Sequence, residues 1–132
     1  MTQGIALYSQ ANNELMYFTT HRRNGDYLER EADARRFEML AGVDGCDPSY
    51  FYTTENLSQL IRELDIVIGE AEKNLDTEIS NHLKEILVLC RLCLWNVGDF
   101  VLVISPFETV SKDNIPKTIP DKFLLNISLV GT

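Results

Sequence analysis

Apolar residues at helical spacing run through the middle of the chain and predict a long amphipathic helix from residue 54 to about residue 75. Its stripe consists of Leu57, Leu60, Ile61, Leu64, Val67, Ile68, Ala71 and Leu75. Thr53 or Thr54 can cap the start of this helix, and Glu55 favours its positive N-terminal end.

A second helix is predicted directly after a short break at Asp76 and Thr77, with Thr77 as its cap. Its stripe consists of Ile79, Leu83, Ile86, Leu87, Cys90, Cys93 and Leu94. From Ile86 to Trp95 the sequence is apolar nearly all round, so we expect this part to be covered on most sides. The short connection predicts an antiparallel helical hairpin at the centre of the fold.

Short β-prone runs flank the hairpin and predict strands at both ends of the chain. The predicted strands are residues 5–8, 15–20, 100–105 and 123–130, and residues 49–53 are either a short strand or an aromatic-rich lead-in to the next helix. Asn12 and Asn13 suit a turn between the first two strands, because asparagine tolerates positive φ.

A shorter amphipathic helix is predicted from Asp26 to about Ala41. Asp26 and Glu29 have the spacing of a capping box, Leu28 and Phe37 contribute to an apolar stripe, and Gly42 suits the residue that ends a helix. The 132 residues therefore predict one α+β domain, with an antiparallel or mixed sheet of four to five strands packed against about three helices.

The chain has a formal net charge of −8 and a pI near 4.7, which repels nucleic acid and anionic membranes and attracts a basic protein. No signal peptide is visible at the N-terminus, and the longest apolar run, from Ile86 to Trp95, is too short to span a bilayer. Three cysteines, two of them inside that run, do not resemble a secreted disulfide framework. We therefore expect a cytoplasmic protein.

Catalytic and metal-binding motifs are missing from the sequence, so we expect neither an enzyme nor a cofactor. Cys90 and Cys93 form a C-x-x-C pair late in an apolar helix, where burial raises the thiol pKa, and Cys46 with His82 completes a zinc site poorly. We interpret the two cysteines as core residues, and His82 and His21 as ordinary surface or loop histidines.

Arg91 is the one charged residue between Ile86 and Trp95. A buried guanidinium needs a partner, so Arg91 is expected to pair with a carboxylate from another element or to extend its head to solvent. The sequence leaves open whether it is a structural ion pair or an anion site, and the ion pair is favoured.

Acidic residues concentrate on the predicted hairpin. Nine acidic and four basic residues lie between Cys46 and Val97, a net charge of −5 for this part of the chain. Acid gathered on one face can steer a basic partner, although a solvated helix face gives the same pattern. The partner-binding residues predicted from it are Glu55, Glu63, Asp65, Glu70, Glu72 and Asp76.

The acidic helices over residues 55–85, the strand over residues 100–105 and the absence of catalytic motifs together resemble the small acidic immunity proteins of bacterial toxin systems, including those of contact-dependent growth inhibition. The resemblance implies a cytosolic inhibitor that binds and neutralises a cognate toxin, often a basic nuclease. It carries no diagnostic residues, so no family site is transferred to this chain.

Two other classes stay open. A regulatory or assembly subunit could dock through Tyr50, Phe51 and Tyr52 together with the proline-containing segment 106–122. A small enzyme of unrecognised type would need a pocket that joins His21 or His82 to a desolvated carboxylate. The sequence does not decide the partner, the oligomeric state or the strand order.

Overall fold

The computed structural model describes residues 2–12 and 14–106, and within them the predicted α+β fold is confirmed. The predicted strand 123–130 and nearly all of segment 106–122 lie outside the described residues. The elements in chain order are β1 (Gly4–Ser9), β2 (Leu15–Thr20), α1 (Gly25–Leu28), η1 (Glu31–Asp33), η2 (Leu40–Gly42), β3 (Ser49–Phe51), α2 (Thr54–Lys73), α3 (Thr77–Trp95) and β4 (Phe100–Ser105).

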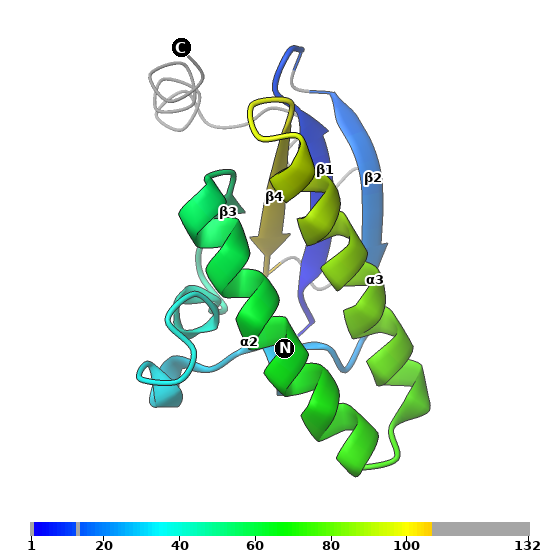
Figure 1. The fold of residues 1–132 in the computed structure, drawn as a ribbon. Helices are drawn as coiled ribbons and strands as arrows, with labels where there is room; N and C mark the ends of the chain where they lie inside the picture. Colours follow the sequence, from blue (N-terminus) through cyan, green and yellow to red (C-terminus); the bar gives the residue numbers. More distant parts are fainter. Residues whose placement is uncertain (1, 13, 107–132) are drawn as a thin grey trace.

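The four strands form one antiparallel sheet in the order β2-β1-β4-β3. The two central strands come from opposite ends of the described chain, so that Ile5 pairs with Ile104 and Tyr8 pairs with Val101. Figure 1 shows α2 and α3 side by side on the same face of this sheet. The predicted helical hairpin is therefore confirmed, and it forms a second layer over the strands.

The main core lies between this hairpin and the sheet, because strand residues alternate between the two faces. Leu7 and Leu102 point toward the helices and join Leu60, Leu64 and Leu83 in one buried cluster. The opposite face carries a smaller buried cluster of Ala6, Tyr8, Val101 and Val103, against which Leu15, Phe18, Tyr50 and Tyr52 pack. Both faces of the two central strands are thus apolar and buried.

Side-chain caps define the start of each long helix. Of the two predicted caps of α2, Thr53 and Thr54, it is the Thr53 hydroxyl that accepts a hydrogen bond from the Asn56 N–H. Asp76, rather than the predicted Thr77, caps α3 by accepting from the Ile79 N–H. A carboxylate is a strong N-terminal acceptor because the helix dipole is positive there.

Leu75 does not belong to the buried stripe of α2. It lies after the helix with φ 58° and its side chain is 88% exposed. The Asp76 N–H donates to the Ala71 carbonyl and the Leu75 N–H to the Glu72 carbonyl, which is the bonding pattern of a Schellman helix end. Leu75 thus takes the left-handed position that usually holds glycine, and this position reverses the chain into α3.

The predicted helix from Asp26 to Ala41 is wrong. Helix α1 ends at Leu28, and Glu29 is extended with φ −85° and ψ 110°. The rest of the segment forms the short turns η1 and η2. Two contacts with other elements explain this outcome. Phe37 and Leu40 are fully buried in the main core, and a carboxylate of α2 binds the amides around Leu40, as described below.

The prediction that α3 is covered on most sides near its end is also wrong. Val88 is 61% exposed and Trp95 is 75% exposed, while Cys90 and Cys93 between them are fully buried. The helix therefore keeps an apolar face toward the core and a second apolar face toward solvent.

Candidate functional site

Glu63 is one of the six predicted partner-binding carboxylates, but it lies inside the protein at 1% exposure. Its carboxylate accepts hydrogen bonds from the backbone N–H groups of Met39 and Leu40 at 2.9–3.0 Å and from the Gln59 side chain at 2.8 Å. A buried carboxylate with several donors is satisfied where it stands. Glu63 therefore holds the η2 turn against α2 and is not part of a solvent-facing patch.

Glu70 and Asp76 are also engaged by other parts of the chain. Glu70 lies 2.7 Å from the Arg30 guanidinium and 3.6 Å from that of Arg36. Asp76 makes a two-pronged contact with Arg23 at 2.6 and 3.1 Å. This arginine is the main cause of the lowered pKa of Asp76. Both carboxylates tie the segment before η2 to the hairpin.

The remaining predicted residues, Glu55, Asp65 and Glu72, are exposed on α2. Glu72 lies 3.7 Å from Lys84 of α3, whereas no cation lies within ion-pair distance of Glu55 or Asp65 among the described residues. Arg62 is also exposed on this helix, between Glu55 and Asp65 in sequence. The six residues therefore do not form one continuous patch.

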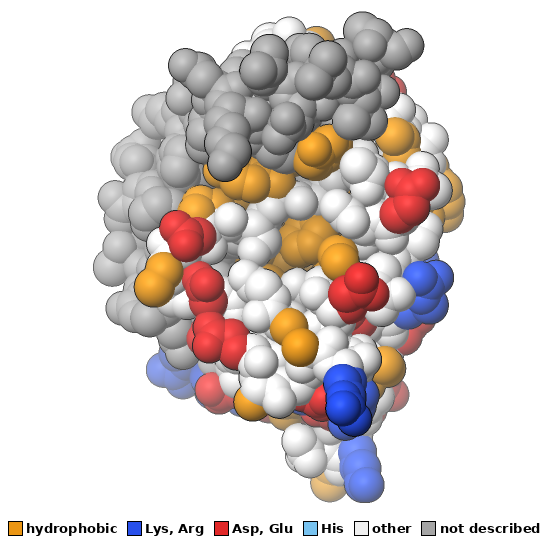
Figure 2. Space-filling view, turned by 90° about the vertical axis from the view of Figure 1, so that its left-hand side faces the viewer, with side chains coloured by type: hydrophobic (Ala, Val, Ile, Leu, Met, Phe, Trp, Pro, Cys, Tyr) orange, Lys and Arg blue, Asp and Glu red, His pale blue; other side chains and the backbone are white. Residues whose placement is uncertain are grey.

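A different concentration of negative charge is visible once the fold is known. From residue 37 to residue 61 the chain has four acidic residues and no lysine or arginine. Of these, Glu38, Asp47 and Glu55 are exposed and Asp44 is half-buried. Figure 2 shows the face that includes α2 and β3, with separate groups of carboxylates and the blue lysine and arginine groups mainly toward its lower end. Sequence reasoning counted acid over the hairpin and missed this stretch, whose signal is the absence of basic residues.

Asp44 is fixed as an anion within this stretch. Its carboxylate accepts from the backbone N–H groups of Cys46 and Asp47 at 2.8 and 2.9 Å. These bonds, that from Asp47 first, lower the pKa of Asp44. Asp44 therefore contributes a negative charge to the loop before β3 at neutral pH.

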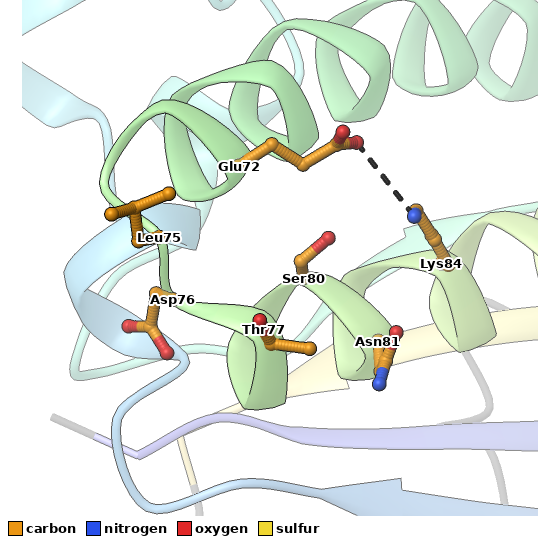
Figure 3. A pocket seen from close by; sticks show the side chains of 7 residues that line it. All are labelled: Glu72, Leu75, Asp76, Thr77, Ser80, Asn81 and Lys84. Carbon is orange, nitrogen blue, oxygen red and sulfur yellow. Dashed lines mark ion pairs between the residues drawn. The ribbon is translucent and has the colours of Figure 1, made fainter.

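The tip of the hairpin holds a cleft of about 280 Å³. Its lining residues are Glu72, Leu75, Asp76, Thr77, Ser80, Asn81 and Lys84. In Figure 3 the Glu72 and Lys84 side chains point toward each other from α2 and α3, while Leu75 and Asp76 lie at the turn. No histidine lines this cleft, so it is not the pocket that an enzyme built on His21 or His82 would need.

His21, directly after β2, and His82 on α3 lie together, with ring centroids 5.8 Å apart. His82 is buried, and burial is the main cause that lowers its pKa to about 4. The Asn24 amide nitrogen lies 2.7 Å from the Gln3 carbonyl and 3.1 Å from His82 Nε2. Asn24 donates to both, which requires His82 Nε2 to accept and makes the ring neutral.

His21 and Glu85 complete this cluster. His21 Nε2 lies 2.6 Å from Glu78, whose side chain is 74% exposed. Glu85 accepts hydrogen bonds from the hydroxyls of Tyr17 and Thr19. Although burial acts to raise it, the pKa of Glu85 is lowered overall by these bonds and by His82. A general acid near neutral pH needs a raised carboxyl pKa, and this cluster offers the opposite.

The cysteines of the C-x-x-C pair lie in the main core, as predicted. Burial raises the pKa of Cys93 to about 12 and that of Cys90 well above its usual value, so both are thiols at neutral pH. Among the described residues, no three His, Cys, Asp or Glu side chains are grouped as a metal site.

Arg91 is exposed, so the alternative in which its head reaches solvent describes it. No carboxylate lies within ion-pair distance of Arg91 in the described part of the chain. It stands on α3 beside the exposed side chains of Val88, Leu92 and Trp95.

The aromatic segment of β3 is largely internal. Phe51 is 3% exposed and packs in the main core, while Tyr50 and Tyr52 pack against the smaller cluster on the other face of the sheet. A docking surface cannot use Phe51 without opening the core.

No described helix has the length and apolar character needed to cross a lipid bilayer. The chain matches no model of a known protein family, and no curated protein or solved structure is significantly similar to it.

Proposed function

We propose that this protein is an acidic protein-binding module that binds and neutralises a basic partner, in the manner of a bacterial toxin-immunity protein. The observation that carries the proposal is a set of four exposed carboxylates, Glu38, Asp47, Glu55 and Asp65, which we call the acidic surface. Between residues 37 and 65 the only lysine or arginine is Arg62. Opposite charge across an interface raises the association rate and selects the partner.

The carboxylates of this acidic surface are not paired with cations of the described chain. None of its four members takes part in an ion pair within the described residues, so each is available to a partner's lysine or arginine. Asp44, held by backbone N–H groups, adds a further negative charge to the loop before β3, which also carries Asp47. Glu63, Glu70 and Asp76 are engaged within the chain and are not part of the proposed interface.

The proposal is tested by recovering the partner of the tagged chain from its native host and titrating it calorimetrically at low and moderate salt. The triple variant Asp47→Lys, Glu55→Lys and Asp65→Lys is expected to bind about 10- to 100-fold more weakly at low salt, because each reversed charge replaces attraction by repulsion. Its affinity should also depend less on salt.

A matched control reverses three exposed carboxylates elsewhere: Glu14→Lys, Asp26→Lys and Asp99→Lys. Both triple variants change the net charge equally, so a difference between them reports the surface rather than the overall charge. Equal binding by the two variants would contradict the proposed interface. Neutralisation is measured separately, as loss of the partner's toxicity or catalytic activity when the proteins are mixed in equal amounts, and a partner that stays active would contradict the inhibitory role.

A further inference from the structure

The exposed face of α3 carries an apolar stripe that the rest of the described chain leaves open. Val88, Leu92 and Trp95 follow one another at helical spacing and are 61%, 36% and 75% exposed. Positions four and three residues apart share one helix face, and this 4-3 spacing is that of a helix that packs against another helix. Exposed aromatic and aliphatic side chains in a row mark interaction surfaces more often than isolated ones do.

The charges on this face suit a second copy of the same chain. From Thr77 to Trp95 the helix carries Glu78, Lys84, Glu85 and Arg91, a net charge of zero in a protein whose total is −8. Two copies therefore meet along α3 without a net charge repulsion between the two helices. Glu85 continues this spacing toward the start of the helix, three residues before Val88. Arg91 lies three residues after Val88, so one acidic and one basic residue flank Val88 at equal separations in sequence.

We propose that α3 is a self-association surface, packing antiparallel against α3 of a second copy about a two-fold axis at Val88. In that arrangement the residue three positions before Val88 in one copy faces the residue three positions after it in the other. Arg91 of each copy then meets Glu85 of the other, and Trp95 covers the turn around Asn81. This surface is separate from the acidic surface of the proposed function and does not depend on it.

Glu85 is prepared for such a contact. The Tyr17 and Thr19 hydroxyls both donate to its carboxylate and hold it at the surface of α3, where its side chain remains 37% exposed. A charged partner that is already fixed loses less conformational freedom when a complex forms. Arg91 has no ion-pair partner of its own among the described residues.

The mass of the full 132-residue chain, measured by sedimentation from micromolar to millimolar concentrations, is expected to rise to that of a dimer. The double variant Val88→Asp with Trp95→Ala should remain monomeric, whereas Ile66→Asp, a change at an exposed apolar residue of α2, should dimerise as the unchanged chain does. A monomeric unchanged chain at every concentration overturns the proposal.

The charge pair is tested by mixing two variants. Arg91→Glu places two acidic residues against each other in the dimer and should weaken it about tenfold, and Glu85→Lys should weaken it in the same way. An equimolar mixture should recover the dimer, because every pair in the mixed dimer is attractive. Two folded variants that remain monomeric when mixed would overturn the proposed register.

Cross-linking tests the two-fold axis even if Glu85→Lys does not fold. In a Cys46→Ser background, Val88→Cys should form a disulfide-linked dimer under mild oxidation, because residues on the axis approach closely enough for a disulfide. Ile66→Cys in the same background is the control and should stay monomeric. Equal cross-linking of both variants would contradict the proposed arrangement.

Discussion

Two regions of this protein have amphipathic sequences, but only one of them folds into the long helices that such a pattern predicts. Residues 54–95 form the two long helices that their periodicity predicts, whereas residues 25–42 form one short helix and two turns. The hairpin has long stripes and a side-chain cap on each helix, so its own residues specify its form. The conformation of the shorter segment is set by its contacts with other elements, above all the hydrogen bonds from its amides to Glu63 and the packing of Phe37 in the main core.

The difference teaches that a short amphipathic pattern is a weak signal when a neighbouring element offers the backbone other partners. A helix would satisfy the Met39 and Leu40 N–H groups within the segment, but Glu63 of α2 satisfies them from outside. Arg30 and Arg36 stack on the Phe37 ring at 4.6 and 5.0 Å and reach Glu70, which also belongs to α2. The segment is therefore built against the hairpin.

The strongest way to break this dependence is Phe37→Ala. Phe37 is fully buried, so its removal leaves a cavity and should lower the free energy of unfolding by about 4 kcal/mol. Denaturant unfolding measures the change, and Glu38→Ala at the exposed neighbouring position should shift it by no more than about 0.5 kcal/mol. A loss below about 1 kcal/mol for Phe37→Ala would show that the segment does not depend on the core.

The contact of the hairpin with the loop after β2 is expected to weaken in mild acid, because His82 of α3 meets Asn24 there. The folded state lowers the pKa of His82 to about 4 from an ordinary value of 6.5, so the unfolded chain takes up a proton first as pH falls. This histidine should therefore cost stability progressively from about pH 6.5 to pH 4, by about 3 kcal/mol in all. No further loss from His82 is expected below pH 4.

The contribution of His82 is isolated by comparing the chain with His82→Gln across this pH range, using denaturant unfolding at each pH. The variant lacks the titrating ring, so its stability should fall less steeply than that of the unchanged chain. Parallel profiles for the two proteins would rule out His82 as the source of the acid sensitivity.

Replacing the carboxylate that holds η2 should have the next largest effect. Glu63→Gln places an amide where only acceptors fit and should lower the free energy of unfolding by about 2 kcal/mol, because at least one buried donor loses its partner. Glu55→Gln changes an exposed carboxylate of the same helix and should have almost no effect. Hydrogen exchange should show the Leu40 amide losing protection in the first variant, and equal protection in both would contradict the assigned role.

The smallest effects concern the hairpin and should be stabilising. Leu75→Gly removes a side chain from a left-handed backbone position with little loss of buried area, and should add about 1 kcal/mol. Gly69→Ala adds a methyl group within α2 where no atom lies within 4 Å of the added carbon, and should add a similar amount. Thermal unfolding measures both, and a lower Tm for Leu75→Gly would contradict the strain assigned to Leu75.

The sequence was sufficient for the elements whose pattern is local. Runs of β-prone residues predict β1, β2 and β4, and long stripes predict α2 and α3 within a few residues. It could not show the strand order, because Ile5 meets Ile104 only after the whole described chain has folded.

The candidate site was predicted less well because charge counts carry no spatial information. Glu63 could have been distinguished, since it lies three residues after Leu60 and four before Val67, on the edge of the buried stripe. Nothing in the sequence marks Glu70 or Asp76 as partners of Arg30 and Arg23, which lie about 40 and 50 residues earlier. The exposed α3 stripe was misread as core because periodicity does not reveal how many sides of a helix are covered.

The strand order has a consequence for synthesis on the ribosome. Strand β1 leaves the ribosome before the other described elements, yet its neighbours in the sheet include β4, the last of them. Until β4 emerges, β1 has only β2 as a partner, and an isolated two-stranded hairpin is marginally stable in water. The helical hairpin depends on contacts between neighbours in sequence, which form quickly. We therefore expect the nascent chain to hold an early helical pair and an open N-terminal hairpin, with the sheet closing only when the segment around Ile104 is free to insert.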